Sequence, residues 1–304
     1  PDDDGELIQA ELQRERASVL MLLGRNDEAK ALLDRAIETL ERLARENPDS
    51  AEMAMQLADA WVDSTVELAR TGEVELARDR AAAAAELLQP WTTEGVAPEV
   101  RSQALAMLRQ AAHNASVNSR ALGEPEERWQ ALAMSSAETW LELEPENPDA
   151  RYGLANSLTN AAQIAADPET ALARWKSGEE LLANLCEEFG DPSYRYRLGV
   201  TRSLIAVALL ASDLAESARW SQAAIEVFEP LVAEHGYSPS GESFSVADPD
   251  EAWILEMIGP GEGGEGAIWV ARRLPDGVIS AHANKARIGT FPEDDPENCI
   301  YSDN

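Results

Sequence analysis

The sequence predicts a mainly α fold: an α-solenoid of about five helix-turn-helix repeats over residues 1–236, followed by a small antiparallel β meander over residues 237–304. Three observations predict it. Similar helical positions recur every 45 to 48 residues, proline-bearing turns separate the units, and the helical period ends near residue 236. A chain of 304 residues also exceeds the usual size of one compact domain, so two domains or an elongated array are expected.

The repeat is clearest on the second helix of each unit. One landmark position recurs at separations of 48, 48, 46 and 45 residues, and this regularity indicates tandem repeats. The landmark residues are Leu33, Ala81, Trp129, Trp175 and Trp220. Three residues later comes a position that is small in four of the five units, as expected where a helix packs closely on its neighbour: Ala36, Ala84, Leu132, Gly178 and Ala223.

Turn residues bound the units and divide each one into two helices. Proline disfavours helix at the residue before it and is tolerated in the first turn of the helix after it, so each proline-bearing turn marks a stop and a restart. These turns lie at residues 46–49, 97–99, 146–149 and 191–193. Within the units, glycine or a small polar residue is suited to end the first helix in a left-handed cap, at residues 24–26, 71–73, 122–124, 166–168 and 211–213.

The second helix of the first unit carries small and apolar residues in an order that the second unit repeats: Gly24, Ala29, Leu33 and Ala36, then Gly72, Ala77, Ala81 and Ala84. This spacing resembles the tetratricopeptide repeat. The period here is longer than the 34 residues of that family, and Pro125 and Glu216 replace the alanine in units three and five. The resemblance implies a concave face that binds a protein or peptide partner. We expect either that Trp129, Trp175 and Trp220 anchor such a partner or that they pack between repeats.

Composition limits the partners. A formal net charge of −31 argues against binding nucleic acid or anionic lipid, because both polyanions would be repelled, and it permits basic partners. Two distant cysteines form neither a disulfide framework nor a zinc site, and we expect no cofactor and no metal. No apolar run reaches the roughly 20 residues of a membrane span. Because the chain opens at Pro1 without methionine, we expect it to begin partway through a longer product.

The hydrophobic period changes after residue 236. Residues 252–258, 267–272 and 278–280 read as short strands, and Pro275-Asp276-Gly277 reads as a tight turn. Glycines at 259, 261 and 264 match the dinucleotide-binding spacing, but that motif must lead into a helix and here it leads into a strand. We therefore assign these glycines to a hairpin loop.

Three segments of the tail read GESFSVADPDEAWILEMIG, GAIWVARRLPDGVISAHANKARI and FPEDDPENCIYS. Together they closely resemble an interior stretch of the bacterial cysteine dipeptidases of the N-terminal-nucleophile hydrolase superfamily. The resemblance covers residues 237–304. It implies a four-layer αββα sandwich in which a processed N-terminal cysteine attacks the dipeptide carbonyl and its own amine serves as base.

The resemblance also implies that the nucleophile region is missing. Cys186 lies in a predicted helix and is expected to pack there, and Cys299 has acidic neighbours that disfavour a thiolate. Asn284 matches the asparagine of the family's Asn-Gln pair, which implies a remnant role in holding substrate or an oxyanion, although Lys285 stands in place of the glutamine. We expect no catalytic residue beyond this remnant and no dipeptidase activity from this chain.

Three functions remain open. The chain is an interaction scaffold with an inert tail, or a dipeptidase fragment or fusion, or the regulatory repeat extension of an absent upstream kinase. The sequence favours the scaffold. It leaves open the identity of the partner and the oligomeric state. The compartment is also left open, with a cytoplasmic location as the favoured expectation.

Overall fold

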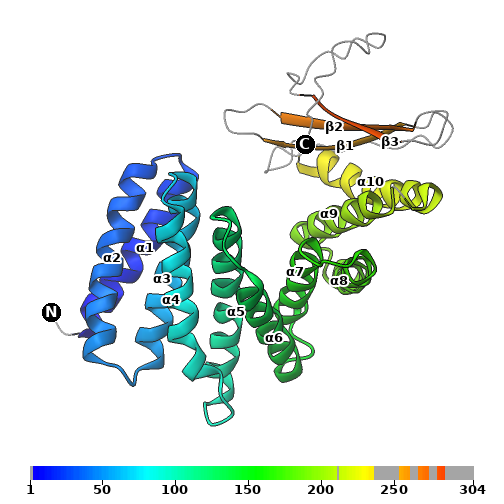
Figure 1. Ribbon diagram of the computed structural model, residues 1–304. Helices are drawn as coiled ribbons and strands as arrows, with labels where there is room; N and C mark the ends of the chain where they lie inside the picture. Colours follow the sequence, from blue (N-terminus) through cyan, green and yellow to red (C-terminus); the bar gives the residue numbers. More distant parts are fainter. Residues whose placement is uncertain (1–2, 211, 236–252, 261–265, 274–278, 285–304) are drawn as a thin grey trace. The chain divides into compact units, whose positions relative to one another are not determined.

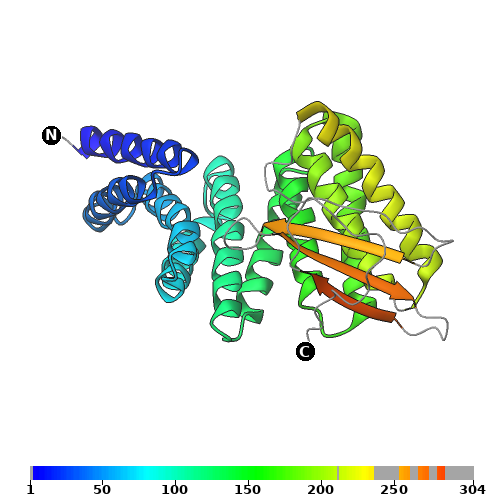
Figure 2. The same cartoon turned by 90° about the horizontal axis from the view of Figure 1, so that it is seen from above.

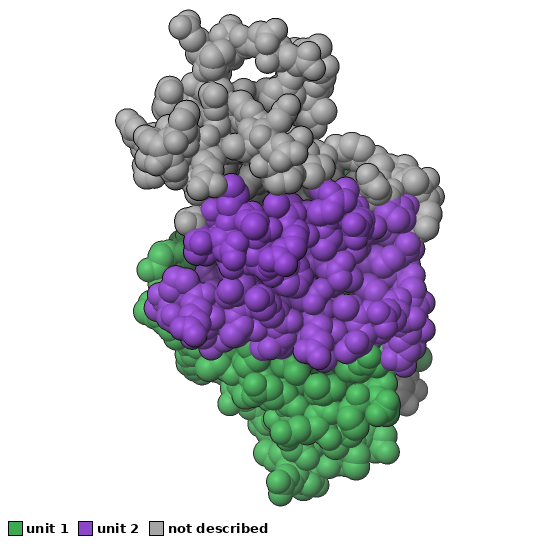
Figure 3. All heavy atoms as spheres, turned by 90° about the vertical axis from the view of Figure 1, so that its right-hand side faces the viewer, with its two compact units in different colours: residues 1–157 green, residues 158–304 purple. Residues whose placement is uncertain are grey.

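The computed structural model describes residues 3–210, 212–235, 253–260, 266–273 and 279–284, and in this part of the chain it contains ten α-helices and three strands (Figures 1 and 2). The chain divides into two compact units, residues 1–157 and residues 158–304, which Figure 3 draws in green and purple. The domain boundary predicted at residues 236 and 237 stays a prediction.

Unit 1 consists of helical hairpins that stack on one another. The two helices of each hairpin pack together, and the second helix of each hairpin packs on the first helix of the next. The helices are α1 (Asp3–Leu22), α2 (Asn26–Glu46), α3 (Ala51–Arg70), α4 (Val74–Leu88), α5 (Pro98–Ala121) and α6 (Glu127–Leu143), with a short 3-10 helix, η1 (Gln89–Thr92), after α4.

Helix α7 (Pro148–Gln163) begins in unit 1 and ends in unit 2. Unit 2 continues with α8 (Pro168–Phe189), α9 (Pro192–Leu209) and α10 (Leu214–His235), and α9 packs against both α8 and α10. The five landmark positions fall on α2, α4, α6, α8 and α10, the second helix of each hairpin. The predicted mainly α fold of helix-turn-helix repeats is therefore confirmed, with three hairpins inside unit 1 and the α9–α10 pair inside unit 2.

The hairpin turns follow the predicted chemistry. Gly24, Gly72 and Gly123 have φ of 71°, 86° and 70°, the left-handed conformation that glycine adopts without strain. In the fourth and fifth hairpins an aspartate caps the second helix. Asp167 accepts hydrogen bonds from the backbone N–H groups of residues 169 and 170, and Asp213 accepts one from residue 216.

The proline-bearing turns separate the units as predicted, but two identical turns behave differently. After the turn at residues 46–49, the Ser50 side chain accepts a hydrogen bond from the Met53 N–H, and α3 begins at Ala51. After the turn at residues 146–149, the next residue is Ala150, which has no hydroxyl, and α7 begins at residue 148 itself. There the side-chain oxygen of Asn147 accepts from the N–H of residue 149. Two differences accompany this shift: Ser50 caps α3, whereas α6 already ends before Pro145, so that Asn147 stands directly before α7.

Alanine makes close packing of the second helices possible. Ala36, Ala81 and Ala84 are fully buried, and Leu33 is nearly so. Two hydrophobic clusters continue from hairpin to hairpin: one joins α1 and α2 to α3, and the other joins α3 and α4 to α5 and α6. The core is therefore a series of inter-hairpin contacts.

Three strands follow α10 in the chain: β1 (Trp253–Pro260), β2 (Gly266–Arg273) and β3 (Ile279–Asn284). They form one antiparallel sheet in the order β1-β2-β3. A register shift between Glu256 and Ile258 interrupts the β1–β2 ladder.

Candidate interaction surface

Charged side chains connect the first helices of the first two hairpins. Arg14 of α1 donates to the side-chain oxygen of Gln56 on α3 at 2.9 Å. Its guanidinium also pairs with Asp63, with Nε 3.1 Å from Oδ2, and with Asp59. Asp59 and Asp63 lie one helical turn apart, so both carboxylates reach the same guanidinium. We call Arg14, Asp59 and Asp63 the acidic clasp.

The acidic clasp holds more negative than positive charge. Partial burial raises the pKa of Asp63 to about 6, the neighbouring Asp59 carboxylate contributes to this rise, and Arg14 opposes both effects. The clasp has two carboxylates for one guanidinium, and both carboxylates are partly exposed to solvent.

Polar side chains also connect α3 to α5. Asn114 of α5 donates to the hydroxyl of Thr65 on α3 at 2.7 Å, and Gln110 donates to the side-chain oxygen of Asn114 at 2.8 Å. Arg109 donates to Gln110 at 3.1 Å. These four residues form a continuous hydrogen-bonded row across two neighbouring first helices. Thr65 is buried and Arg109 is largely buried, so Gln110 and Asn114, with the acidic clasp and Gln56, define the surface that we call the first-helix face.

Arg109 ends this row in a tightly packed environment. Burial lowers the pKa of its guanidinium, and its Nε has no hydrogen-bond partner. A Cβ atom added at Gly153 would lie 3.2 Å from that Nε and 3.1 Å from the ring of Trp140. The Trp140 ring N–H donates to the Ser102 hydroxyl at 3.0 Å. Glycine at 153 therefore leaves room for both large side chains.

Unit 2 joins its first helices in the same way. Arg197 of α9 donates to the side-chain oxygen of Asn160 on α7 at 3.1 Å. The hydroxyls of Thr159 and Thr201 lie 3.5 Å apart between the same two helices. Polar contact between first helices is therefore a recurring feature of the hairpins.

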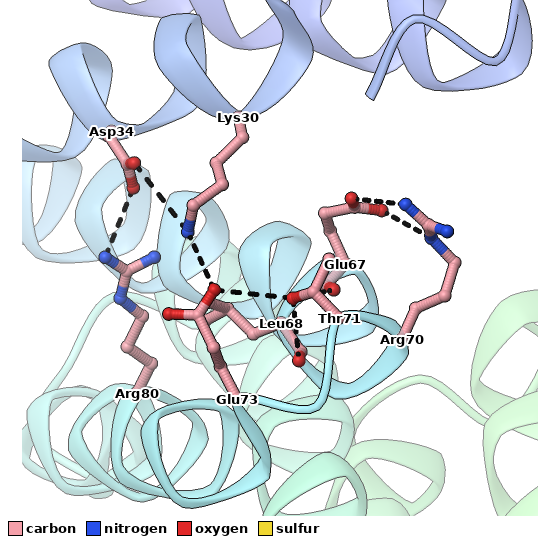
Figure 4. A network of polar contacts seen from close by, with 8 residues as sticks. All are labelled: Lys30, Asp34, Glu67, Leu68, Arg70, Thr71, Glu73 and Arg80. Carbon is pink, nitrogen blue, oxygen red and sulfur yellow. Dashed lines mark hydrogen bonds and ion pairs between the residues drawn. The ribbon is translucent and has the colours of Figure 1, made fainter. Parts of the chain in front are cut away.

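A second set of charged contacts holds neighbouring hairpins together in unit 1 (Figure 4). Lys30 of α2 lies 3.3 Å from Glu73, the residue that follows the left-handed Gly72. In the next hairpin Arg78, at the equivalent position of α4, pairs with Glu124, the residue that follows Gly123. The same kind of ion pair therefore recurs between neighbouring hairpins of unit 1.

The structure places the three predicted tryptophan anchors differently. Trp129 is buried in the hydrophobic cluster of α3 to α6, and the Arg128 guanidinium lies 4.4 Å from its ring centre. Trp175 and Trp220 are half-buried. The Trp220 ring N–H donates to Glu216 of its own helix at 3.0 Å. Burial supports the packing alternative for Trp129, and a partner-binding role for the three residues stays a prediction.

The residues singled out for chemistry belong to unit 2 or lie outside the described residues. Cys186 is a free cysteine in α8, and burial raises the pKa of its thiol to about 11. Asn284 ends β3, where its backbone pairs with Ile268. Cys299 lies outside the described residues. Among the described residues, no group of three or more histidine, cysteine or acidic side chains is arranged to hold a metal ion.

The first-helix face was not predicted from the sequence, because the repeat pattern that identified the hairpins lies on their second helices. The signal that could have revealed it is a polar residue interrupting the apolar side of a first helix, as Arg14, Asp63 and Asn114 do. The described helices include none with the length and apolar character of a membrane span.

Comparisons with known proteins give one family match, to the C-terminal half of the chain, and several similar solved structures. A family model described as peptidase family C69 matches residues 145–304. That match starts in the turn between α6 and α7, well ahead of the predicted boundary at 237. Dipeptidase A of Lactobacillus helveticus is 42% identical over 69 residues, which are 22% of this chain and 13% of that protein. The chain therefore spans only a small part of this curated relative.

Solved structures similar to this chain include two that are described as TPR proteins. BtubC from P. vanneervenii is 15% identical with a TM-score of 0.44, covering 82% of this chain and 97% of that one. A thermophilic TPR protein from Thermus thermophilus is 16% identical with a TM-score of 0.37, covering 71% and 90%. YrrB, described as a TPR protein with an unusual peptide-binding site, is 15% identical with a TM-score of 0.34, covering 73% and 89%.

Proposed function

The chain belongs to peptidase family C69, and we propose that within this family its helical hairpins serve as a protein-interaction scaffold that binds a basic segment of a partner through the first-helix face. One observation carries the proposal. Charged and amide side chains form connected contacts along α1, α3 and α5, and the acidic clasp within them has an excess carboxylate.

The charge of the whole chain supports a basic partner. A net charge of −31 attracts a cationic segment from a distance and repels polyanions. At short range, Asp59 and Asp63 supply the carboxylates for a lysine or arginine. The side-chain NH2 group of Gln56, whose oxygen accepts from Arg14, is a donor for a peptide carbonyl. The long-range field gives the association rate, and the local contacts give the specificity.

A labelled peptide tests this proposal. The probe is a fluorescein-labelled dodecapeptide of alternating lysine and alanine, and the comparison peptide has glutamate in place of lysine. We expect saturable binding of the lysine peptide that weakens as salt is added, and no binding of the glutamate peptide. The double variant D59N/D63N should weaken binding at least threefold.

A matched control separates local recognition from general attraction. Glu38 and Glu142 are exposed acids on the second helices α2 and α6, so E38Q/E142Q removes the same charge from another surface. This control should bind the lysine peptide as the parent chain does. If E38Q/E142Q weakened binding as much as D59N/D63N, the partner would sense only the net charge, and the first-helix face would lose its assigned role.

The family match supports a second proposal for the C-terminal part. We propose that β1, β2 and β3 belong to a sheet of the αββα hydrolase type, and that this chain alone does not hydrolyse dipeptides. Within the described residues, the available thiol is Cys186, which has a pKa raised to about 11 and lies inside a helix, so it carries no α-amine to serve as base. Asn284 keeps the remnant role that its resemblance implies.

Purified chain incubated with a panel of dipeptides, with release of free amino acids as the readout, checks the second proposal. We expect no turnover above a buffer blank. Turnover that disappears in C186S or C299S would overturn it, and turnover that survives in both would point to a contaminating peptidase.

A further inference from the structure

Helix α1 and the residue that follows it carry a row of large apolar side chains that face solvent. Ile8, Leu12, Val19 and Leu23 are 56%, 59%, 55% and 66% exposed. Spacings of four, seven and four residues place them along one side of a helix over about 22 Å. We call them the α1 stripe. The opposite side of α1 faces the core through buried apolar residues: Leu7, Ala10, Ala17 and Leu20.

Among the described residues, no other element covers this row of side chains. Figure 2 shows α1 at the amino-terminal edge of unit 1. An exposed apolar row at such a position indicates an interaction surface.

The α1 stripe differs from the surface by which an internal hairpin packs against the hairpin before it. Leu12, Ala60 and Ala111 each lie twelve residues before the left-handed glycine of their hairpin. Ala60 and Ala111 are fully buried in the clusters that join their helices to the preceding hairpin. The small alanine side chain allows that close approach. Leucine at the same position requires a more distant helix.

Two charged residues flank the middle of the stripe. Glu15 and Arg16 are both exposed, and among the described residues neither has an ion-pair partner within the chain. Consecutive residues in a helix are turned by roughly 100°, so the two side chains lie on opposite edges of the stripe. In two parallel α1 helices related by a two-fold axis, Glu15 of each copy faces Arg16 of the other. In an antiparallel pair, like charges would face each other.

We propose that the α1 stripe is a self-association surface, on which a second copy of this chain packs its own α1 in parallel orientation. Each apolar residue meets its counterpart along the two-fold axis, and two reciprocal Glu15–Arg16 pairs fix the orientation. A contact of eight apolar side chains buries on the order of 1,000 Å², below the roughly 1,200 Å² of a standard stable interface. The dimer is therefore weak and reversible, and it leaves the first-helix face free.

Sedimentation velocity of the full chain from about 2 to 200 µM tests the proposal. The mass should rise with concentration from 33.0 kDa, the mass of one copy, towards twice that value. L12E/V19E should stay monomeric at every concentration. The matched control V66E/V117E changes valines that are 70% and 45% exposed on α3 and α5, and it should associate as the parent chain does. Circular dichroism verifies that both variants keep their helices.

Charge exchange tests the parallel orientation separately. E15R or R16E alone should weaken association at least fivefold, because each places like charges opposite one another. The double variant E15R/R16E should restore it. A parent chain that remains monomeric at 200 µM, an equal loss in V66E/V117E, or a double variant as weak as the single variants would each overturn the proposal.

Discussion

Gly199 provides a test of how tightly the last hairpin is packed. It lies in α9, and the ring of Phe228 from α10 covers it. A Cβ atom at position 199 would stand 2.4 Å, 2.6 Å and 2.7 Å from three ring carbons of Phe228. Carbon atoms normally approach to about 3.5–4.0 Å, so alanine at this position requires the ring to move by roughly 1 Å.

Two opposing effects set the expected stability of G199A. Overpacking of a filled core costs typically about 1–3 kcal/mol, and three close atoms from one buried ring place this site towards the upper end. Alanine in place of glycine within a helix stabilises the folded state by about 1 kcal/mol through its higher helix propensity. We therefore expect G199A to destabilise the α9–α10 hairpin by about 1–2 kcal/mol.

Hydrogen exchange of the α9 amides, combined with urea unfolding, measures this local stability. In an F228L background the ring is gone, so G199A should become neutral or slightly stabilising, which reveals the pairwise coupling. G153A is the matched comparison, because its closest contacts are 3.1–3.3 Å and require smaller shifts. A stabilising G199A in the parent chain, or an equal cost in the F228L background, would refute the reasoning.

Four further predictions concern Ser50, Asp63, the acidic clasp and Cys186. S50A should lower the stability of the α2–α3 region by about 1 kcal/mol in urea unfolding, because the N-cap of α3 is lost; an unchanged midpoint would contradict this. In the folded state the pKa of Asp63 is raised to about 6, so the protonated carboxyl favours folding. This stabilisation is complete below the unfolded pKa and is lost as the pH rises through about 6. The free energy of unfolding of D63N should therefore fall less over this pH range. Peptide binding at the acidic clasp should weaken as the pH falls through the same value. Cys186 in a C299S background should react with iodoacetamide far more slowly at pH 8 than in urea, since a rise in pKa from 9.0 to about 11 leaves a roughly hundredfold smaller thiolate fraction; equal rates would show an accessible thiolate.

Much of the helical fold can be predicted from the sequence, because interactions between residues close in the chain specify it. Proline stops one helix and starts the next, glycine supplies a left-handed φ, and the spacing of apolar residues locates the buried face. The identical turns at 46–49 and 146–149 show the limit of such prediction, because residues on either side of the turn, Pro145 before one and Ser50 after the other, accompany different helix boundaries.

The candidate surface could not be derived in the same way. Arg14 and Asp63 are 49 positions apart, and their contact depends on how α1 and α3 lie against each other. The tryptophans illustrate the same point, because equivalent repeat positions leave Trp129 buried and Trp220 half-buried.

By itself, the sequence determined five hairpins, their turns, an acidic charge balance and a tail that resembles a hydrolase. Only the tertiary structure decided which polar side chains of different first helices meet and which face of α1 stays uncovered. The reason is physical: turns and helix faces depend on neighbours a few residues away, whereas contacts between hairpins depend on side-chain packing across distances that no local pattern encodes.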